Sequence, residues 1–192
     1  MTYSDQLAEH FSAQPSFSVG DAKRLFAGIS EGYLDVFLHN LAMKNRIHRI
    51  SRGIYTFHDD PQVVGFAFRP FYYGLQDAMS LHNIWGQETN PVVITPRKVV
   101  SGLRQFEGAN YVVRRVNRKM FFGYELMRYG EMWIPVSDVE KTFMDMVYFE
   151  QNISRDALMA FKQKIDGKKL FSYLEKCDEW MVKRVRNALP IK

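Results

Sequence analysis

The chain has 192 residues, of which 46% are hydrophobic and 15% aromatic, and its net charge is +5. This composition is typical of a globular protein with one large core or two small ones, and no apolar run is long enough to span a bilayer. The lone Cys177 excludes an internal disulfide and a cysteine-based metal site. The N-terminus lacks the pattern of a signal peptide, so we expect a cytoplasmic protein. The positive charge is compatible with a polyanionic partner.

Residues 18–57 contain two short helical patterns followed by two strand-like runs. Ser18 and Ser30 are suited to cap the two helices, and one more helix is predicted before them, capped by Ser4. The third helix places apolar residues on one face at helical spacing: Leu34, Phe37, Leu38 and Leu41. The strand-like runs flank a turn at Gly53. This order predicts a winged helix-turn-helix domain over residues 1–58.

A winged helix-turn-helix binds duplex DNA with its third helix and its wing. The exposed face of the third helix is not strongly basic, so hydroxyl and amide groups would read base edges while cations contact phosphates. We expect DNA contacts from ten residues: Ser30, Tyr33, His39, Asn40, Lys44, Arg46, Arg49, Arg52, Arg97 and Lys98. The last two begin a basic stretch in the second half of the chain. The alternative is a winged helix that docks a protein.

A charged run containing Pro61 marks a domain boundary, and residues 63–192 are interpreted as a second domain. The predicted fold class is α+β, with a small, mainly antiparallel sheet and C-terminal helices in this second domain. Residues 111–116 and 119–125 are predicted to pair as a hairpin. Further strands are expected at residues 91–95 and 132–136.

A helical period returns after Ser137, which forms a capping-box pattern with Glu140. Four positions separate Lys141 from Asp145 in this helix, so the two are predicted to pair on its surface. The lone His82 on an otherwise apolar helical face is interpreted as a hydrogen-bonded core histidine. Three more helices are predicted from here to the C-terminus.

Four motifs occur in order: Arg52-Gly-Ile-Tyr55, the helix around Ala78-Met-Ser-Leu-His82, Pro91-Val-Val-Ile-Thr95 and Val136-Ser-Asp-Val-Glu-Lys-Thr-Phe-Met-Asp145. Together they resemble the AbiEi-type antitoxin family of type IV toxin–antitoxin systems, over roughly residues 4–150. The resemblance implies a transcriptional repressor of its own operon that binds double-stranded operator DNA with repeats. It also implies that the C-terminal domain counteracts a nucleotidyltransferase-like toxin encoded beside it.

An enzymatic interpretation finds little support in the sequence. No phosphate-binding glycine loop, nucleophile elbow or paired histidine spacing occurs, so we expect no catalysis, no cofactor and no metal. Clustered carboxylates can hold Mg²⁺. The second half of the chain has four candidates, but their spacing does not require a metal site and exposure to solvent explains them equally well: Glu107, Glu125, Glu131 and Asp138.

Two other functions stay open besides the family resemblance. The chain could be a solitary regulator or a general nucleic-acid binder that uses cations interleaved with aromatic residues on the predicted hairpin: Arg114, Arg115, Arg118 and Lys119. The apolar residues of the C-terminal helices could also exceed what a small domain buries and form a protein-docking patch: Phe161, Leu170, Phe171, Leu174, Trp180 and Val185.

Overall fold

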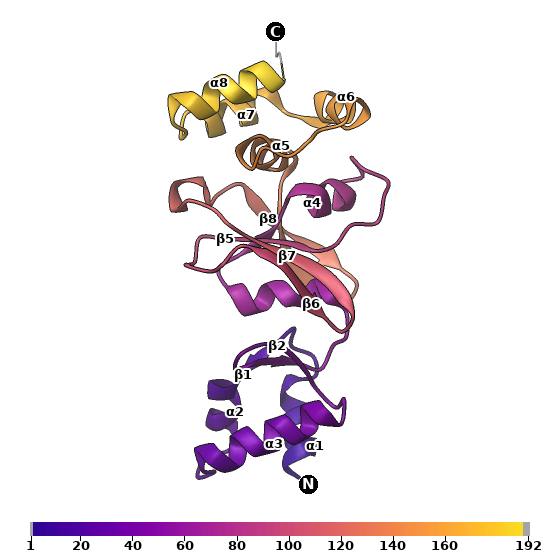
Figure 1. The fold of residues 1–192 in the computed structure, drawn as a ribbon, viewed down its shortest axis with the longest axis vertical. Helices are drawn as coiled ribbons and strands as arrows, with labels where there is room; N and C mark the ends of the chain where they lie inside the picture. The colour runs from indigo at the N-terminus through magenta and orange to yellow at the C-terminus, as the bar shows by residue number, and fades with distance from the viewer. Residues whose placement is uncertain (1, 190–192) are drawn as a thin grey trace. The chain divides into compact units, whose positions relative to one another are not determined.

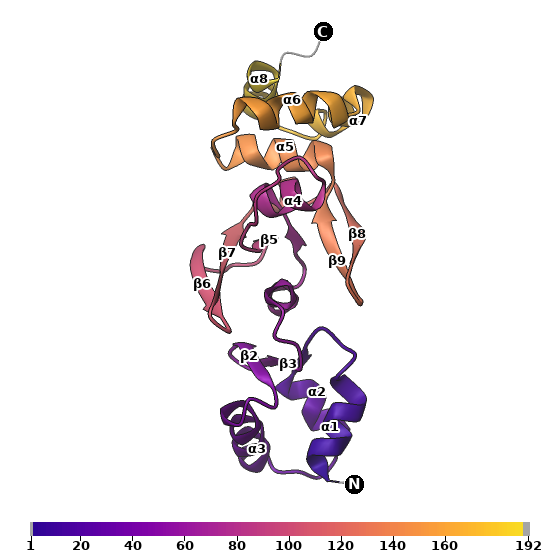
Figure 2. The same cartoon turned by 90° about the vertical axis from the view of Figure 1, so that its right-hand side faces the viewer.

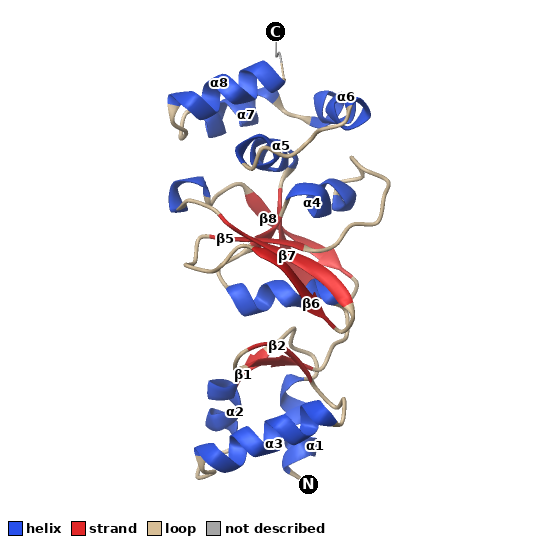
Figure 3. Cartoon of the chain, viewed as in Figure 1, coloured by secondary structure: helices blue, strands red, loops and turns tan. Residues whose placement is uncertain are grey.

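The computed structural model describes residues 2–189, which form two compact units (Figure 1). The first unit comprises the chain up to Arg69 together with Arg104–Tyr111, and the second comprises Pro70–Leu103 and the chain from Val112 onward. Helices and strands are mixed along the chain, so the fold class is α+β (Figure 3). Because the first unit includes a later segment, the chain passes between the units three times.

The first unit has three α-helices, a small sheet and a 3₁₀ helix. Its elements are α1 (Tyr3–Phe11), β1 (Phe17–Ser18), α2 (Val19–Leu25), α3 (Glu31–Met43), β2 (His48–Ser51), β3 (Ile54–Thr56) and η1 (Pro61–Phe68). Ser18 and Ser30 cap α2 and α3 as predicted, each accepting a backbone hydrogen bond three residues on. The predicted cap at Ser4 is wrong, because Thr2 forms the capping box with Asp5.

The three strands of the first unit form an antiparallel sheet in the order β1-β3-β2. Gly53 has a φ of 74° in the turn between β2 and β3, which is the left-handed conformation that glycine adopts without strain. Tyr55 of β3 stacks on Phe17 of β1, with 6.0 Å between the ring centroids. The predicted apolar face of α3 is buried, with Leu34 and Leu38 fully inaccessible in the core beneath this sheet.

The second unit contains most of a six-stranded sheet and five α-helices among the described residues. Its elements are β4 (Tyr72–Tyr73), α4 (Leu75–Leu81), β5 (Val92–Thr95), β6 (Gly102–Phe106), β7 (Ala109–Arg115), η2 (Arg118–Met120), β8 (Tyr124–Tyr129), β9 (Met132–Ser137), α5 (Val139–Tyr148), α6 (Arg155–Lys164), α7 (Gly167–Leu174) and α8 (Glu179–Ala188). The β6–β7 turn belongs to the first unit. The helices predicted at the C-terminus are confirmed as α6, α7 and α8.

The larger sheet is mixed, with the strand order β6-β7-β5-β4-β9-β8. Strand β5 pairs parallel with β7, and β4 pairs parallel with β9, whereas β4–β5 and β8–β9 are antiparallel. The prediction of a mainly antiparallel sheet is therefore corrected to a mixed one. The predicted hairpin of residues 111–116 and 119–125 is wrong, because β7 pairs with β5, and residues 119–125 comprise the end of η2, a connection and the start of β8.

Helix α5 is at the centre of the helical layer of the second unit. It lies beside α4, and α6, α7 and α8 pack against it (Figure 2). All side chains from Glu140 to Met146 on this helix are buried. Such a helix lacks a solvent face over most of its length, so its polar residues must find partners inside the protein.

Candidate nucleic-acid interface and a buried polar network

The predicted DNA-contact residues of the first unit lie on α3 and on the segment that follows it. All eight are exposed: Ser30, Tyr33, His39, Asn40, Lys44, Arg46, Arg49 and Arg52. The N-cap bond from the Tyr33 amide to Ser30 Oγ, 3.3 Å long, begins α3. The remaining two, Arg97 and Lys98, are exposed in the loop after β5 and belong to the second unit.

The exposed face of α3 carries apolar and aromatic groups as well as polar ones. Tyr33 is 53% exposed, Val36 58% and Met43 71%, which are large values for such side chains. His39 and Asn40 are exposed between them. A face of this kind can contact base edges and methyl groups in a groove, because it combines amide and hydroxyl groups with apolar surface.

An ion pair that the sequence did not reveal links α2 to α3. Lys23 of α2 pairs with Glu31 in the first turn of α3. Hydrogen bonding and the charge of Lys23 hold the pKa of the Glu31 carboxyl below its ordinary value. The pair offsets one of the acidic charges near the N-terminus of α3, which would otherwise repel a polyanion. Its residues are eight apart, beyond the range of local helical pairing, so only the tertiary structure shows it.

The β2–β3 turn presents two arginines to solvent. Arg49 is exposed on β2, where its Nε donates to the Ser51 carbonyl at 3.3 Å. Arg52 is exposed at the tip beside Gly53. At the other end of β2, His48 Nδ1 lies 3.1 Å from a carboxylate oxygen of Glu107 in the β6–β7 turn. The arginines therefore stay accessible while a contact within the first unit anchors the base of the turn.

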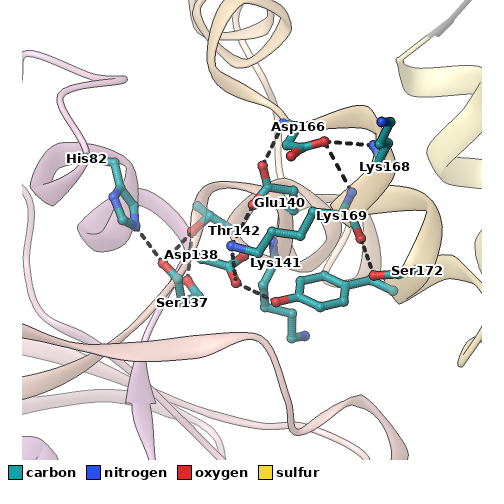
Figure 4. Close-up of polar contacts among 11 residues, drawn as sticks. His82, Ser137, Asp138, Glu140, Lys141, Thr142, Asp166, Lys168, Lys169 and Ser172 are labelled. Carbon is teal, nitrogen blue, oxygen red and sulfur yellow. Dashed lines mark hydrogen bonds and ion pairs between the residues drawn. The ribbon is translucent and has the colours of Figure 1, made fainter.

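The motif from Ser137 to Asp145 forms a buried polar network around the start of α5 (Figure 4). Asp138, not Ser137, is the N-cap of α5, and its Oδ1 accepts from the Lys141 amide at 2.8 Å. The Glu140 carboxylate accepts from the Asp166 amide at 2.8 Å at the start of α7. The predicted capping box is therefore wrong, and Glu140 instead connects α5 to a segment distant in sequence.

Lys141 and Asp145 form an ion pair that is fully inaccessible to solvent. The prediction of a surface pair is wrong, because α5 is covered on this side by the sheet and by α7. The hydroxyl of Tyr72 donates to Asp145 Oδ2 at 2.8 Å, and the ammonium group lies over the rings of Tyr72 and Phe122. Burial raises the pKa of the Asp145 carboxyl, and the ammonium and the tyrosine hydroxyl act against this rise.

Helix α7 contributes a second cation to the network. Lys169 Nζ lies 3.1 Å from Asp138 Oδ2 and 3.2 Å from Glu140 Oε2. Burial lowers the pKa of Lys169, but the two carboxylates outweigh that effect and raise it above its ordinary value. The Tyr173 hydroxyl donates to Asp138 Oδ2 at 2.6 Å, and burial together with this bond raises its pKa to about 12.

Two further contacts connect the network to the start of α5 and to α4. His82 Nε2 hydrogen bonds to the Ser137 carbonyl oxygen at 2.6 Å, so the predicted hydrogen bond is confirmed, but His82 is half-buried and does not lie in the core. The hydroxyls of Ser137 and Thr142 are 2.7 Å apart. Each polar side chain named here has a partner inside the protein, so the motif joins β4, α4, α5 and α7.

The apolar residues predicted to form a C-terminal docking patch are mostly part of the core. Phe161, Leu170, Leu174 and Val185 are buried around α5. Only Phe171 and Trp180 of that set are strongly exposed, at 54% and 46%. That predicted surface is therefore wrong, because α6, α7 and α8 bury their apolar faces against α5.

The four carboxylates weighed for a metal site lie in separate places. Glu107 is in the β6–β7 turn, Glu125 is in β8, Glu131 is in the β8–β9 turn, and Asp138 caps α5. Among residues 2–189, no group of three or more histidine, cysteine or acidic residues has an arrangement that could hold a metal ion. Over the same residues, no helix has the length and apolar character needed to cross a membrane.

Comparison with known proteins finds a similar fold among solved structures. No family model and no curated protein matches the chain. The structure is similar to the crystal structure of the RV2827C protein from Mycobacterium tuberculosis, with a TM-score of 0.59 and 10% sequence identity. The match covers 99% of this chain and 77% of the other. At this identity, the similarity shows a shared fold alone.

Proposed function

We propose that the first unit is a winged helix-turn-helix that binds duplex DNA, and that the chain is an AbiEi-type antitoxin and transcriptional repressor acting in the cytoplasm. In this proposal α2 and α3 are the helix-turn-helix, and the β2–β3 hairpin is the wing. The observation that supports this proposal is that one face of α3 and the tip of the β2–β3 turn, where Arg52 lies, are both exposed. Phosphate contacts supply most non-specific affinity, whereas contacts to base edges supply sequence discrimination.

The chemistry of the exposed groups supports separate roles for α3 and the wing. Tyr33 and Asn40 carry hydroxyl and amide groups that can hydrogen bond to base edges in a major groove. Arg49 and Arg52 carry delocalised cations suited to phosphate oxygens or to a narrow minor groove. Lys44 and Arg46, between α3 and β2, add two exposed cations. Arg97 and Lys98 belong to the other unit and are assigned to backbone contacts alone.

The toxin-directed part of the proposal rests on the family resemblance. In it, the second unit counteracts a nucleotidyltransferase-like toxin. We expect the neighbouring reading frame to encode a nucleotidyltransferase-like protein. Its expression should stop growth only when this chain is absent. Growth arrest that persists when this chain is co-expressed would count against the antitoxin role and leave a solitary regulator.

The test of DNA binding is fluorescence anisotropy with the DNA upstream of the gene and with a scrambled duplex across a salt series. Arg52→Ala is compared with Arg155→Ala, which removes an exposed arginine from α6 in the other unit. Wild type should prefer the upstream duplex. Arg52→Ala should weaken binding to both duplexes by about tenfold and reduce the slope of log K against log salt by about one, whereas Arg155→Ala should not.

A second substitution separates base reading from phosphate contact. Asn40→Ala should reduce the preference for the upstream duplex by about 1–3 kcal/mol while leaving the salt slope unchanged. Equal, weak binding of both duplexes that is insensitive to Arg52 would refute the assignment, and would favour a winged helix that docks a protein.

A further inference from the structure

The second unit contains an open pocket of about 540 Å³, and Lys98 is its one lining residue that the DNA-binding proposal uses. It forms where the parallel strands β5 and β7 end. The register pairs Thr95 with Arg115, so the loop after β5 and the residues after β7 leave the sheet at the same edge. Because the strands run in the same direction, they bring Lys98 and Arg118 to one hollow although the two are distant in sequence.

Three cations and no carboxylate line this pocket. Lys98, Arg115 and Arg118 are exposed, and among residues 2–189 their side chains have no hydrogen-bond or ion-pair partner. Three acidic groups of this unit pair with cations outside the pocket: Asp138 and Glu140 pair with Lys169, and Glu150 pairs with Arg184. Like charges that converge without compensation repel one another, and a multiply charged anion relieves that repulsion.

One wall of the pocket is aromatic. It is formed by Tyr148 at the end of α5, which is half-buried. The Tyr148 ring packs edge-on to Phe149, with 4.9 Å between the ring centroids, and its centroid lies 6.0 Å from that of Trp180. Two neighbouring rings therefore hold it in position. A supported ring beside cations is the combination that binds a nucleobase and its phosphates together. Asn117, whose Oδ1 accepts from the Lys119 amide, adds an amide group to the lining.

The size of the hollow fits a small ligand. Pockets for small molecules have volumes of about 300–1,000 Å³. A second hollow of about 300 Å³ shares Pro96 and Arg118 with the first and adds Arg97 and Phe121, which extends the basic surface. Contacts to a duplex backbone are made by groups that project from a surface, whereas here the cations surround a depression.

We propose that this pocket binds a nucleotide carrying two or more phosphates. Lys98, Arg115 and Arg118 hold the phosphates, and the base lies against Tyr148. All of these residues belong to the second unit, so the site is separate from the α3 face and the wing. The proposal goes beyond DNA binding and does not depend on it.

The test is isothermal titration calorimetry of the full chain with the four ribonucleoside triphosphates, and with inorganic tripolyphosphate and adenosine as partial ligands. The substitutions Lys98→Ala and Arg118→Ala are combined, and the control combines Arg155→Ala with Lys162→Ala, which removes the same two residue types from the surface of α6. At least one triphosphate should bind wild type and the control equally. The pocket variant should bind it at least about tenfold more weakly.

The partial ligands decide which part of a nucleotide is recognised. A nucleotide that binds more tightly than tripolyphosphate supports a contribution from the base, and adenosine alone should bind weakly or not at all. Equal binding of tripolyphosphate and all nucleotides would overturn the nucleotide assignment, as would equal affinities in the pocket and control variants.

A duplex arm separates this site from the proposed DNA interface. Because Lys98 is also assigned to DNA backbone contacts, this comparison uses Arg118→Ala alone. Arg118→Ala should retain wild-type affinity for the upstream duplex, and Arg52→Ala should retain wild-type affinity for the nucleotide. If no nucleotide binds and Arg118→Ala instead loses duplex affinity, the hollow is a DNA backbone contact and the nucleotide proposal is refuted. Intrinsic fluorescence confirms that each variant is folded.

Discussion

Replacing Lys141 by methionine tests how strongly the buried ion pair of α5 stabilises the second unit. Methionine keeps much of the side-chain volume but leaves the Asp145 carboxylate buried without its cation. Removing one partner of a buried pair costs about 3–5 kcal/mol, because the remaining charge is uncompensated. With a urea m-value of about 2 kcal/mol per M, this loss lowers the unfolding midpoint by about 1.5–2.5 M.

Intrinsic fluorescence in a urea titration is the assay, because it reports on the second unit within the full chain. All three tryptophans, Trp85, Trp133 and Trp180, lie in that unit. Lys162→Met is the control, since it makes the same change at an exposed position of α6. That control should shift the free energy of unfolding by less than about 0.5 kcal/mol.

Two further measurements separate loss of charge pairing from simple loss of packing. The Lys141→Met penalty should shrink as the pH falls toward about 5, because the pKa of Asp145 is already raised by burial and rises further without the lysine. Replacing Asp145 by leucine and Tyr72 by phenylalanine in the same variant should recover most of the stability, since no buried polar group remains unpaired. A Lys141→Met penalty below about 1 kcal/mol, or equal to that of Lys162→Met, would refute the reasoning.

Three other substitutions have outcomes that follow from local geometry. Gly123→Ala should lower the free energy of unfolding by about 2–4 kcal/mol, measured by tryptophan fluorescence in urea, because φ is 70° and an added Cβ would lie 2.9 Å from Lys141 Cβ. The control Gly130→Ala should lower it by about 1 kcal/mol, because an added Cβ there meets open space. Tyr173→Phe should abolish part of the fall in urea midpoint between about pH 10 and 12, since the Tyr173 phenol has a pKa of about 12 in the folded state and loses its proton at lower pH when unfolded. Ser18→Ala should lower the free energy of unfolding by about 1 kcal/mol, measured by circular dichroism. This loss relative to wild type should shrink below about pH 4, as the Asp21 carboxylate of the capping box is protonated.

Features set by neighbours in sequence were predicted well. The Ser18 and Ser30 caps, the buried face of α3 and the left-handed Gly53 turn are confirmed, because each depends on residues within about one turn of helix or hairpin. The exposure of all ten predicted DNA-contact residues also follows from helical periodicity and from the charge of lysine and arginine.

Features set by distant partners were not predictable. Nothing local indicates that β7 pairs parallel with β5, because the pairing depends on which strands the connections bring together. The motif at the start of α5 has the spacing of a surface helix, and local rules place Lys141 and Asp145 in water. They are buried because β4, through Tyr72, and α7 both cover that face. Phe161 and Val185 of α6 and α8 were considered for an exposed docking patch, because the sequence does not show that both pack against α5.

The division of the first unit between two chain segments affects its biosynthesis. Arg104 and Tyr111 pack on Phe68 of η1, and Phe106 and Glu107 contact His48 of β2. Domains generally fold as units during translation, but here the residues that complete the N-terminal unit follow a long piece of the second. The contacts to Phe68 and His48 can therefore be completed only after Tyr111 has left the ribosome, whereas the core of the first three helices consists of residues 7–57.

The same division limits how the module can be moved. Cutting the gene after Arg69 would remove the part of the first unit that covers Phe68, and it would leave Phe106 and Tyr111, now almost fully buried, exposed on the remaining fragment. A transplantable form of the first unit has to carry the β6–β7 turn with it, or a designed replacement for that turn.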